Sequence, residues 1–71
     1  MNILVFKTNI RYKKQLRQVQ PWLNKIEGLY KWNVDFHDHD KVLRLETTDV
    51  SPIKIQSLLN QLGYYCEELY D

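Results

Sequence analysis

The sequence predicts one small α+β domain with four strands and two helices in the order βαββαβ. Apolar residues alternate with polar ones where strands are expected, and they recur every three or four residues where helices are expected. The chain has 71 residues. A chain of this size buries only about 60% of its unfolded surface, which is enough for one core. We therefore expect a single domain over residues 1–71.

The first strand and the first helix occupy the basic N-terminal part of the chain. Alternating side chains predict a strand from Asn2 to Thr8. From Tyr12 onward the apolar spacing becomes that of an amphipathic helix. This stripe consists of Tyr12, Leu16, Val19, Leu23 and Ile26. Pro21 interrupts it and predicts a kink or a second short helical turn near Gln20, and Gly28 is expected to cap the helix.

A β-hairpin is expected next. Leu29 to Phe36 alternates apolar with polar side chains, and Lys41 to Thr47 returns with Leu43 and Leu45 pointing inward. The polar turn between the two strands is His37 to Asp40.

The second helix has clear start and end signals. Ser51 is a favourable N-cap, Pro52 suits the first helical position, and Gly63 is expected to end the helix. Its buried stripe consists of Ile55, Leu58, Leu59 and Leu62. Tyr64 to Leu69 is expected to form the final strand.

This element order in so short a chain predicts a ferredoxin-like fold. Right-handed crossovers give a four-stranded antiparallel sheet of order 4-1-3-2, with both helices on one face. The topology also brings three turns to one end of the molecule. These are Arg11 to Lys14, His37 to Asp40, and Gly63-Tyr64.

Short stretches distributed over nearly the whole chain resemble those of a known family. They are Phe6–Ile10, Lys31–Asp35, Asp40–Leu43 and Leu62–Tyr64, together with Val19 and Leu23. They are similar to the small bacterial members of the heavy-metal-associated (HMA) domain family. That family comprises copper-chaperone-like modules and soluble domains that precede metal-pumping ATPases.

The resemblance implies a metal site that this chain lacks. In the family a Met-x-Cys-x-x-Cys motif follows the first strand, and a Gly-Val pair sixteen residues beyond the first cysteine opens the second strand. Gly28-Leu29 resembles that pair. Counting back from it places the methionine at Ile10 and the cysteines at Tyr12 and Gln15. The family's paired thiolates suit soft ions such as Cu(I). A phenol with a pKa near 10 and a neutral amide do not. We therefore expect a degenerate HMA-like module without a cofactor, and two interpretations of Tyr12 stay open: packing in the helix stripe, or an exposed anchor for a partner.

The basic residues around this loop form a candidate docking surface. Six basic residues and no acid precede Glu27, whereas nine acids and four bases lie from there onward. The candidate partner-binding residues are Arg11, Tyr12, Lys13, Lys14 and Arg17. Lysines in the first turn of a helix oppose its dipole, so local stability does not select them. An acidic protein partner would suit this surface, and solvated lysines are the alternative interpretation.

Other residues offer alternative functions. His37 and His39 could bind Zn, Ni or Cu as a divergent metal site, but adjacent polar residues in a turn are more often simply solvated, and a closed zinc site takes four ligands. Cys66 is expected to be a buried, apolar thiol. An outward patch of Ile3, Val5, Val42 and Tyr65 could form a homodimer interface.

Several functional classes are disfavoured. The basic end of the first helix could bind nucleic acid weakly, but the outward positions of the two central strands lack the aromatic residues that RNA-recognition motifs use. Neither a phosphate loop nor a catalytic triad is visible, so we expect no enzyme. A single cysteine and the absence of long apolar runs predict a cytoplasmic protein without membrane insertion.

Overall fold

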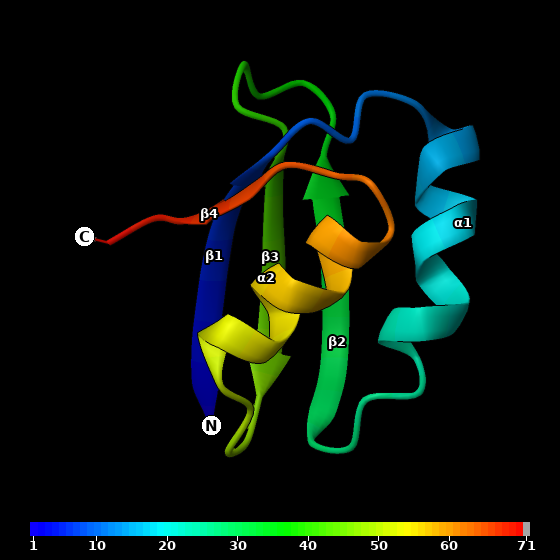
Figure 1. The fold of residues 1–71 in the computed structure, drawn as a ribbon. Helices are drawn as coiled ribbons and strands as arrows, with labels where there is room; N and C mark the ends of the chain where they lie inside the picture. The colour runs from blue at the N-terminus through cyan, green and yellow to red at the C-terminus, as the bar shows by residue number, and fades with distance from the viewer. Residues whose placement is uncertain (71) are drawn as a thin grey trace.

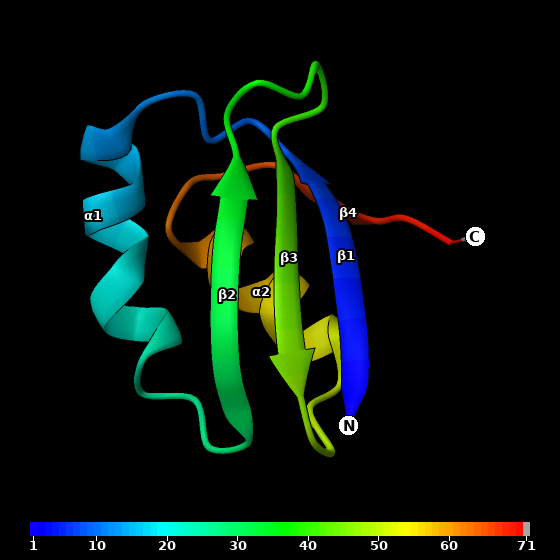
Figure 2. The same cartoon turned by 180° about the vertical axis from the view of Figure 1, so that it is seen from behind.

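The computed structural model describes residues 1–70, and Asp71, the last residue of the expected domain, lies outside them. The elements are β1 (Asn2–Thr8), α1 (Lys13–Leu23), β2 (Leu29–Asp35), β3 (Val42–Thr47), α2 (Pro52–Gln61) and β4 (Cys66–Glu68). The strands form one antiparallel sheet of order β2-β3-β1-β4. Both helices lie on one side of it (Figures 1 and 2). The predicted ferredoxin-like topology is confirmed.

The core lies between the sheet and the two helices. The central strands place every second residue in it, because side chains alternate across a strand. The apolar residues with no exposed surface come from both helices, both central strands and, in the case of Ile10, the β1–α1 loop: Phe6, Ile10, Val19, Leu23, Leu43, Leu45, Ile55 and Leu59. The alternation predicted for β1 and β3 is therefore confirmed, and in β2 it holds from Trp32 to Asp35, after an irregularity between Leu29 and Lys31. None of the helices in residues 1–70 has the length and apolarity to cross a bilayer.

Helix α1 ends earlier than predicted. Asn24 is its C-cap, so the predicted role of Gly28 is wrong. Gly28 instead has φ +89°, and a Cβ there would overlap the carbonyl oxygen of Thr48. Pro21 lies inside α1, which is one helix from Lys13 to Leu23, so no second helix begins near Gln20. The apolar stripe misled the prediction because Ile26 packs against the core from the turn that follows the helix.

Strand β4 is shorter than the predicted Tyr64 to Leu69. Gly63 has φ +93°, and the Tyr64 N–H bonds to the Leu59 carbonyl at 2.9 Å, which completes a Schellman motif at the end of α2. Tyr64 therefore belongs to the helix end, and strand pairing begins only at Cys66. By contrast, the hairpin strands β2 and β3 begin and end within one residue of their predicted bounds.

Candidate functional site

The three turns expected at one end of the molecule do meet there (Figure 1). The Thr8 hydroxyl donates to the Lys41 carbonyl at 2.6 Å, and the Thr8 N–H donates to the Asp40 carbonyl at 3.1 Å. The Tyr65 N–H donates to the Asn9 side-chain oxygen at 2.9 Å. These bonds tie the hairpin and the segment before β4 to the end of β1. They fix the base of the β1–α1 loop.

A buried residue anchors the β1–α1 loop to the core. Ile10, where the HMA resemblance would place a methionine, has no exposed surface, and its N–H donates to the Thr8 hydroxyl at 3.2 Å. Beyond this anchor the chain turns outward. Tyr12 is 65% exposed, so it does not belong to the buried stripe of α1. Of the two interpretations of Tyr12, the structure supports the exposed aromatic side chain.

Gln15 has a structural role that the sequence reasoning missed. Its side-chain oxygen accepts hydrogen bonds from the backbone N–H groups of Arg11 at 2.8 Å and Tyr12 at 3.2 Å. Gln15 is the third residue of α1, the position from which a Gln or Glu side chain reaches back to the N-cap. That pattern was the available signal. It was masked because the N-cap, Tyr12, is not one of the usual capping residues.

Tyr12 and Gln15, where the HMA resemblance would place two cysteines, do not fit a soft metal ion. The Gln15 oxygen already satisfies two backbone donors, and an amide oxygen is a hard ligand. The Tyr12 side chain is exposed, and a phenol oxygen is likewise a hard ligand that suits a soft ion poorly. Within residues 1–70, no three His, Cys, Asp or Glu side chains lie close enough together to hold a metal ion.

The basic residues of this loop and helix lie on the surface. We call Arg11, Tyr12, Lys13, Lys14 and Arg17 the basic face, and all five residues are exposed. In the part of the chain that the structure describes, the one ion pair joins Lys7 Nζ to Asp40 Oδ1 at 3.5 Å. The hairpin carboxylates therefore do not pair with the basic face. Its charges are available to a partner.

The hairpin turn uses its carboxylates to hold its own backbone. Asp35 Oδ1 accepts from the His37 N–H at 3.0 Å, and Asp38 Oδ1 accepts from the Asp40 N–H at 2.7 Å. His37 and His39 are both exposed. The turn thus offers two accessible imidazoles beside carboxylates that are already engaged.

Cys66 faces the core from β4 and is buried. Desolvation raises the pKa of its thiol from 9.0 to about 12. The thiol is therefore protonated at neutral pH, and a protonated thiol is a poor nucleophile and a poor metal ligand.

The outward patch on the open sheet face is interrupted by charge. Ile3 and Tyr65 are exposed, whereas Val5 and Val42 are half-buried. Strand pairing places Glu46 beside Ile3, Arg44 beside Val5, and Asp35 beside Val42. The four residues do not form one continuous apolar surface.

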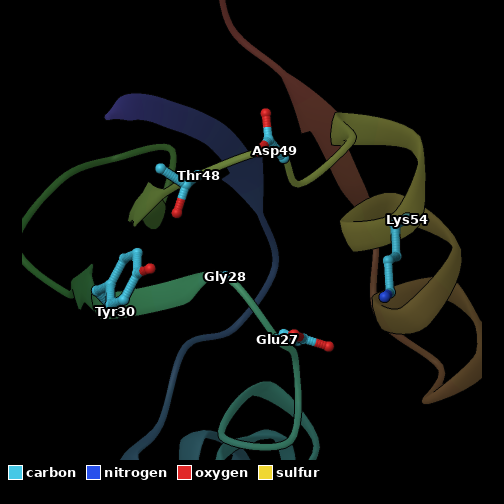
Figure 3. A pocket seen from close by; sticks show the side chains of 6 residues that line it. All are labelled: Glu27, Gly28, Tyr30, Thr48, Asp49 and Lys54. Carbon is cyan, nitrogen blue, oxygen red and sulfur yellow. The ribbon is translucent and has the colours of Figure 1, made fainter.

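A shallow pocket of about 400 Å³ lies between the start of β2 and the β3–α2 loop (Figure 3), at the end of the sheet opposite to the β1–α1 loop (Figure 1). It is lined by Glu27, Gly28, Tyr30, Thr48, Asp49 and Lys54. Two of these residues are joined by a backbone hydrogen bond, in which the Thr48 N–H donates to the Gly28 carbonyl at 2.8 Å. Two carboxylates and one ammonium share the pocket, so its charge favours no single class of ligand.

Solved structures share this arrangement of strands and helices. A chain in the solution structure of the Atx1–Cu(I)–Ccc2a complex aligns with a TM-score of 0.83 and 14% identity, covering 100% of this chain and 99% of that one. The apo form of the HMA domain of the copper chaperone for superoxide dismutase aligns with a TM-score of 0.76 and 19% identity. This chain has the ferredoxin-like fold of these domains. The alignment with the superoxide dismutase chaperone covers 96% of this chain but only 66% of that one.

A third solved chain, from work on crosstalk between Cu(I) and Zn(II) homeostasis, aligns with a TM-score of 0.80. Its identity is 11%, over 97% of this chain and 100% of that one. No protein-family model and no curated protein matches the sequence. At such low identities the likeness establishes the fold alone, and function has to be argued from the residues of this chain.

Proposed function

We propose that this chain is a non-catalytic module of the HMA fold that has lost the thiolate metal site and acts by binding another protein. The observation that carries the proposal is the side chain of Gln15. It stands at the second cysteine position and accepts two backbone hydrogen bonds, at 2.8 and 3.2 Å. The loop is thus stabilised by one of its own side chains, and the Gln15 oxygen is already engaged.

The chemistry of the basic face supports a protein partner. Tyr12 is an exposed aromatic, and aromatic side chains carry much of the binding energy at interfaces. The flanking cations are unpaired within residues 1–70 and would steer an acidic surface toward Tyr12. The Atx1–Cu(I)–Ccc2a complex is an example of a chain of this fold in a protein complex.

A binding role also agrees with the structural roles of Ser51 and Cys66, two side chains whose chemistry could otherwise provide a nucleophile. The Ser51 hydroxyl accepts a hydrogen bond from the Ile53 N–H at 3.2 Å and caps α2. The Cys66 thiol is buried, and its pKa is raised to about 12. Neither group is an activated, accessible nucleophile.

The proposal can be tested by photo-crosslinking in cells that naturally carry the protein. A photoreactive phenylalanine analogue replaces Tyr12 in one variant and Tyr30 in a matched control, because the two side chains are 65% and 66% exposed. We expect position 12 to crosslink to a defined protein that position 30 does not capture. Reversing the charge of Lys13 and Lys14 should abolish that crosslink.

Two results would contradict the proposal. The first is an identical set of crosslinks from both positions, and the second is a crosslink at position 12 that survives the charge reversal. Crosslinking to DNA or RNA, with retention that falls steeply as salt rises, would instead assign the basic face to nucleic acid.

A further inference from the structure

Strand β4 covers only part of β1. It pairs with Phe6, Lys7 and Thr8. Directly after β4, the Leu69 N–H donates a last hydrogen bond to the Val5 carbonyl at 2.8 Å. Beyond that point the chain leaves the sheet (Figure 1). The segment 2–4 therefore has β3 on one side and, among residues 1–70, no strand on the other (Figure 2). We call this segment the open edge.

The backbone of Ile3 points to the open side. In an antiparallel strand the N–H and C=O of one residue point the same way, and successive residues point to opposite sides. The Val5 carbonyl bonds toward β4, whereas the Thr8 N–H bonds to Asp40 on the hairpin side. Ile3 lies two residues from Val5, so its N–H and C=O both face outward at the open edge.

Exposed apolar side chains surround the open edge. They are Met1, Ile3, Leu69 and Tyr70, with 76%, 51%, 37% and 84% of their surfaces exposed. Residues 1–6 include no charged side chain. Edge strands are normally protected by lysine, proline, a bulge or a covering element, and the open edge has none of these within the described residues.

We propose that the open edge pairs antiparallel with the open edge of a second copy of this chain, forming a dimer with one continuous sheet. The occupant is a second copy because the segment is self-complementary. Each copy supplies the N–H and C=O of Ile3, and a two-fold axis satisfies both edges at once. Two uncharged segments also meet without like-charge repulsion.

The geometry limits the assembly to two copies. Pairing consumes the open edge of each copy, and the opposite edge of the sheet is β2, which α1 flanks (Figure 2). The exposed side chains of β2 include Lys31 and Asp35, which oppose edge-to-edge growth. The basic face lies beyond the far end of β1, so dimerisation leaves it free in both copies. This inference is independent of the proposed function.

Sedimentation equilibrium of the full chain over a range of concentrations tests the dimer. We expect a reversible monomer–dimer equilibrium, and we expect the Ile3 amide to become protected from hydrogen exchange as concentration rises. Ile3→Pro removes the outward donor without removing a bond to β3. It should weaken dimerisation at least about tenfold, equivalent to about 1.4 kcal/mol.

A matched pair of charge substitutions separates the edge from general surface effects. Ile3→Lys and Ile53→Lys each replace an exposed isoleucine, but Ile53 lies on α2. Only Ile3→Lys should abolish the dimer, and circular dichroism would show that both variants fold. A wild-type chain that stays monomeric up to about 1 mM would overturn the proposal. So would a dimer that Ile3→Pro and Ile3→Lys leave unchanged.

Discussion

Replacing Gln15 with alanine should destabilise the β1–α1 loop by a measurable amount. The substitution removes the one acceptor that serves the N–H groups of Arg11, at 2.8 Å, and Tyr12, at 3.2 Å. A typical hydrogen bond contributes about 0.5–1.5 kcal/mol net. Both donors are at the surface, where water replaces the lost acceptor, so the lower end of that range applies. At about 0.5 kcal/mol for each of the two hydrogen bonds, we expect Gln15→Ala to lower the free energy of unfolding by about 1 kcal/mol.

The matched control is Gln20→Ala. Gln20 is an exposed residue of the same helix, so both variants carry the same change in helix propensity. For a domain of this size, about 1 kcal/mol corresponds to a fall in Tm of about 4–8 °C. Thermal unfolding would compare the two variants, and hydrogen exchange would locate the change. The Arg11 and Tyr12 amides should exchange faster in Gln15→Ala alone. Equal Tm values for both variants would refute the structural role of Gln15.

Three further predictions concern the turns, the buried thiol and the basic face. Gly28→Ala should lower the free energy of unfolding in urea by about 2 kcal/mol or more, because φ is positive and the new Cβ would overlap the Thr48 carbonyl oxygen. Gly63→Ala also places alanine at positive φ but meets open space, so it should cost about 1 kcal/mol. Equal costs would contradict this difference. Cys66 should resist thiol labelling in the folded protein at pH 8. Folding raises the pKa of its thiol from 9.0 to about 12, so the contribution of the buried, protonated thiol to stability is complete below pH 9 and is lost toward pH 12. Fast labelling of the folded protein would argue against burial. Reversing the charge of Lys13 and Lys14 should raise stability by a few tenths of a kcal/mol each while abolishing the position-12 crosslink, and a loss of both stability and crosslink would indicate misfolding instead.

The sequence predicted features whose cause is local. The Ser51 cap, Pro52 at the start of α2 and Gly63 at its end are set by neighbouring residues, and each was confirmed. Period-two alternation located β1 exactly at Asn2–Thr8. The topology followed because few arrangements accommodate this element order in a short chain.

Features set by tertiary packing were not predictable in the same way. Ile26 continues the helical stripe in sequence but packs from a turn, so the end of α1 at Leu23 was missed. The length of β4 depends on where the chain leaves the sheet, which no local pattern records. At the candidate site, composition placed the basic face on the surface. The role of Gln15 in holding the β1–α1 loop became visible only from its hydrogen bonds.

The central proposal is that the β1–α1 loop of this ferredoxin-like fold holds no soft metal ion, and a competition titration with Cu(I) and with Zn(II) tests it most directly. Cys66→Ala would serve as the background in which the loop is examined. We predict no stoichiometric high-affinity uptake by the wild-type loop, and uptake of one ion when Tyr12→Cys and Gln15→Cys are combined. High-affinity binding by the wild-type chain would contradict the account. If that binding disappeared in His37→Ala/His39→Ala, it would assign a divergent metal site to the hairpin.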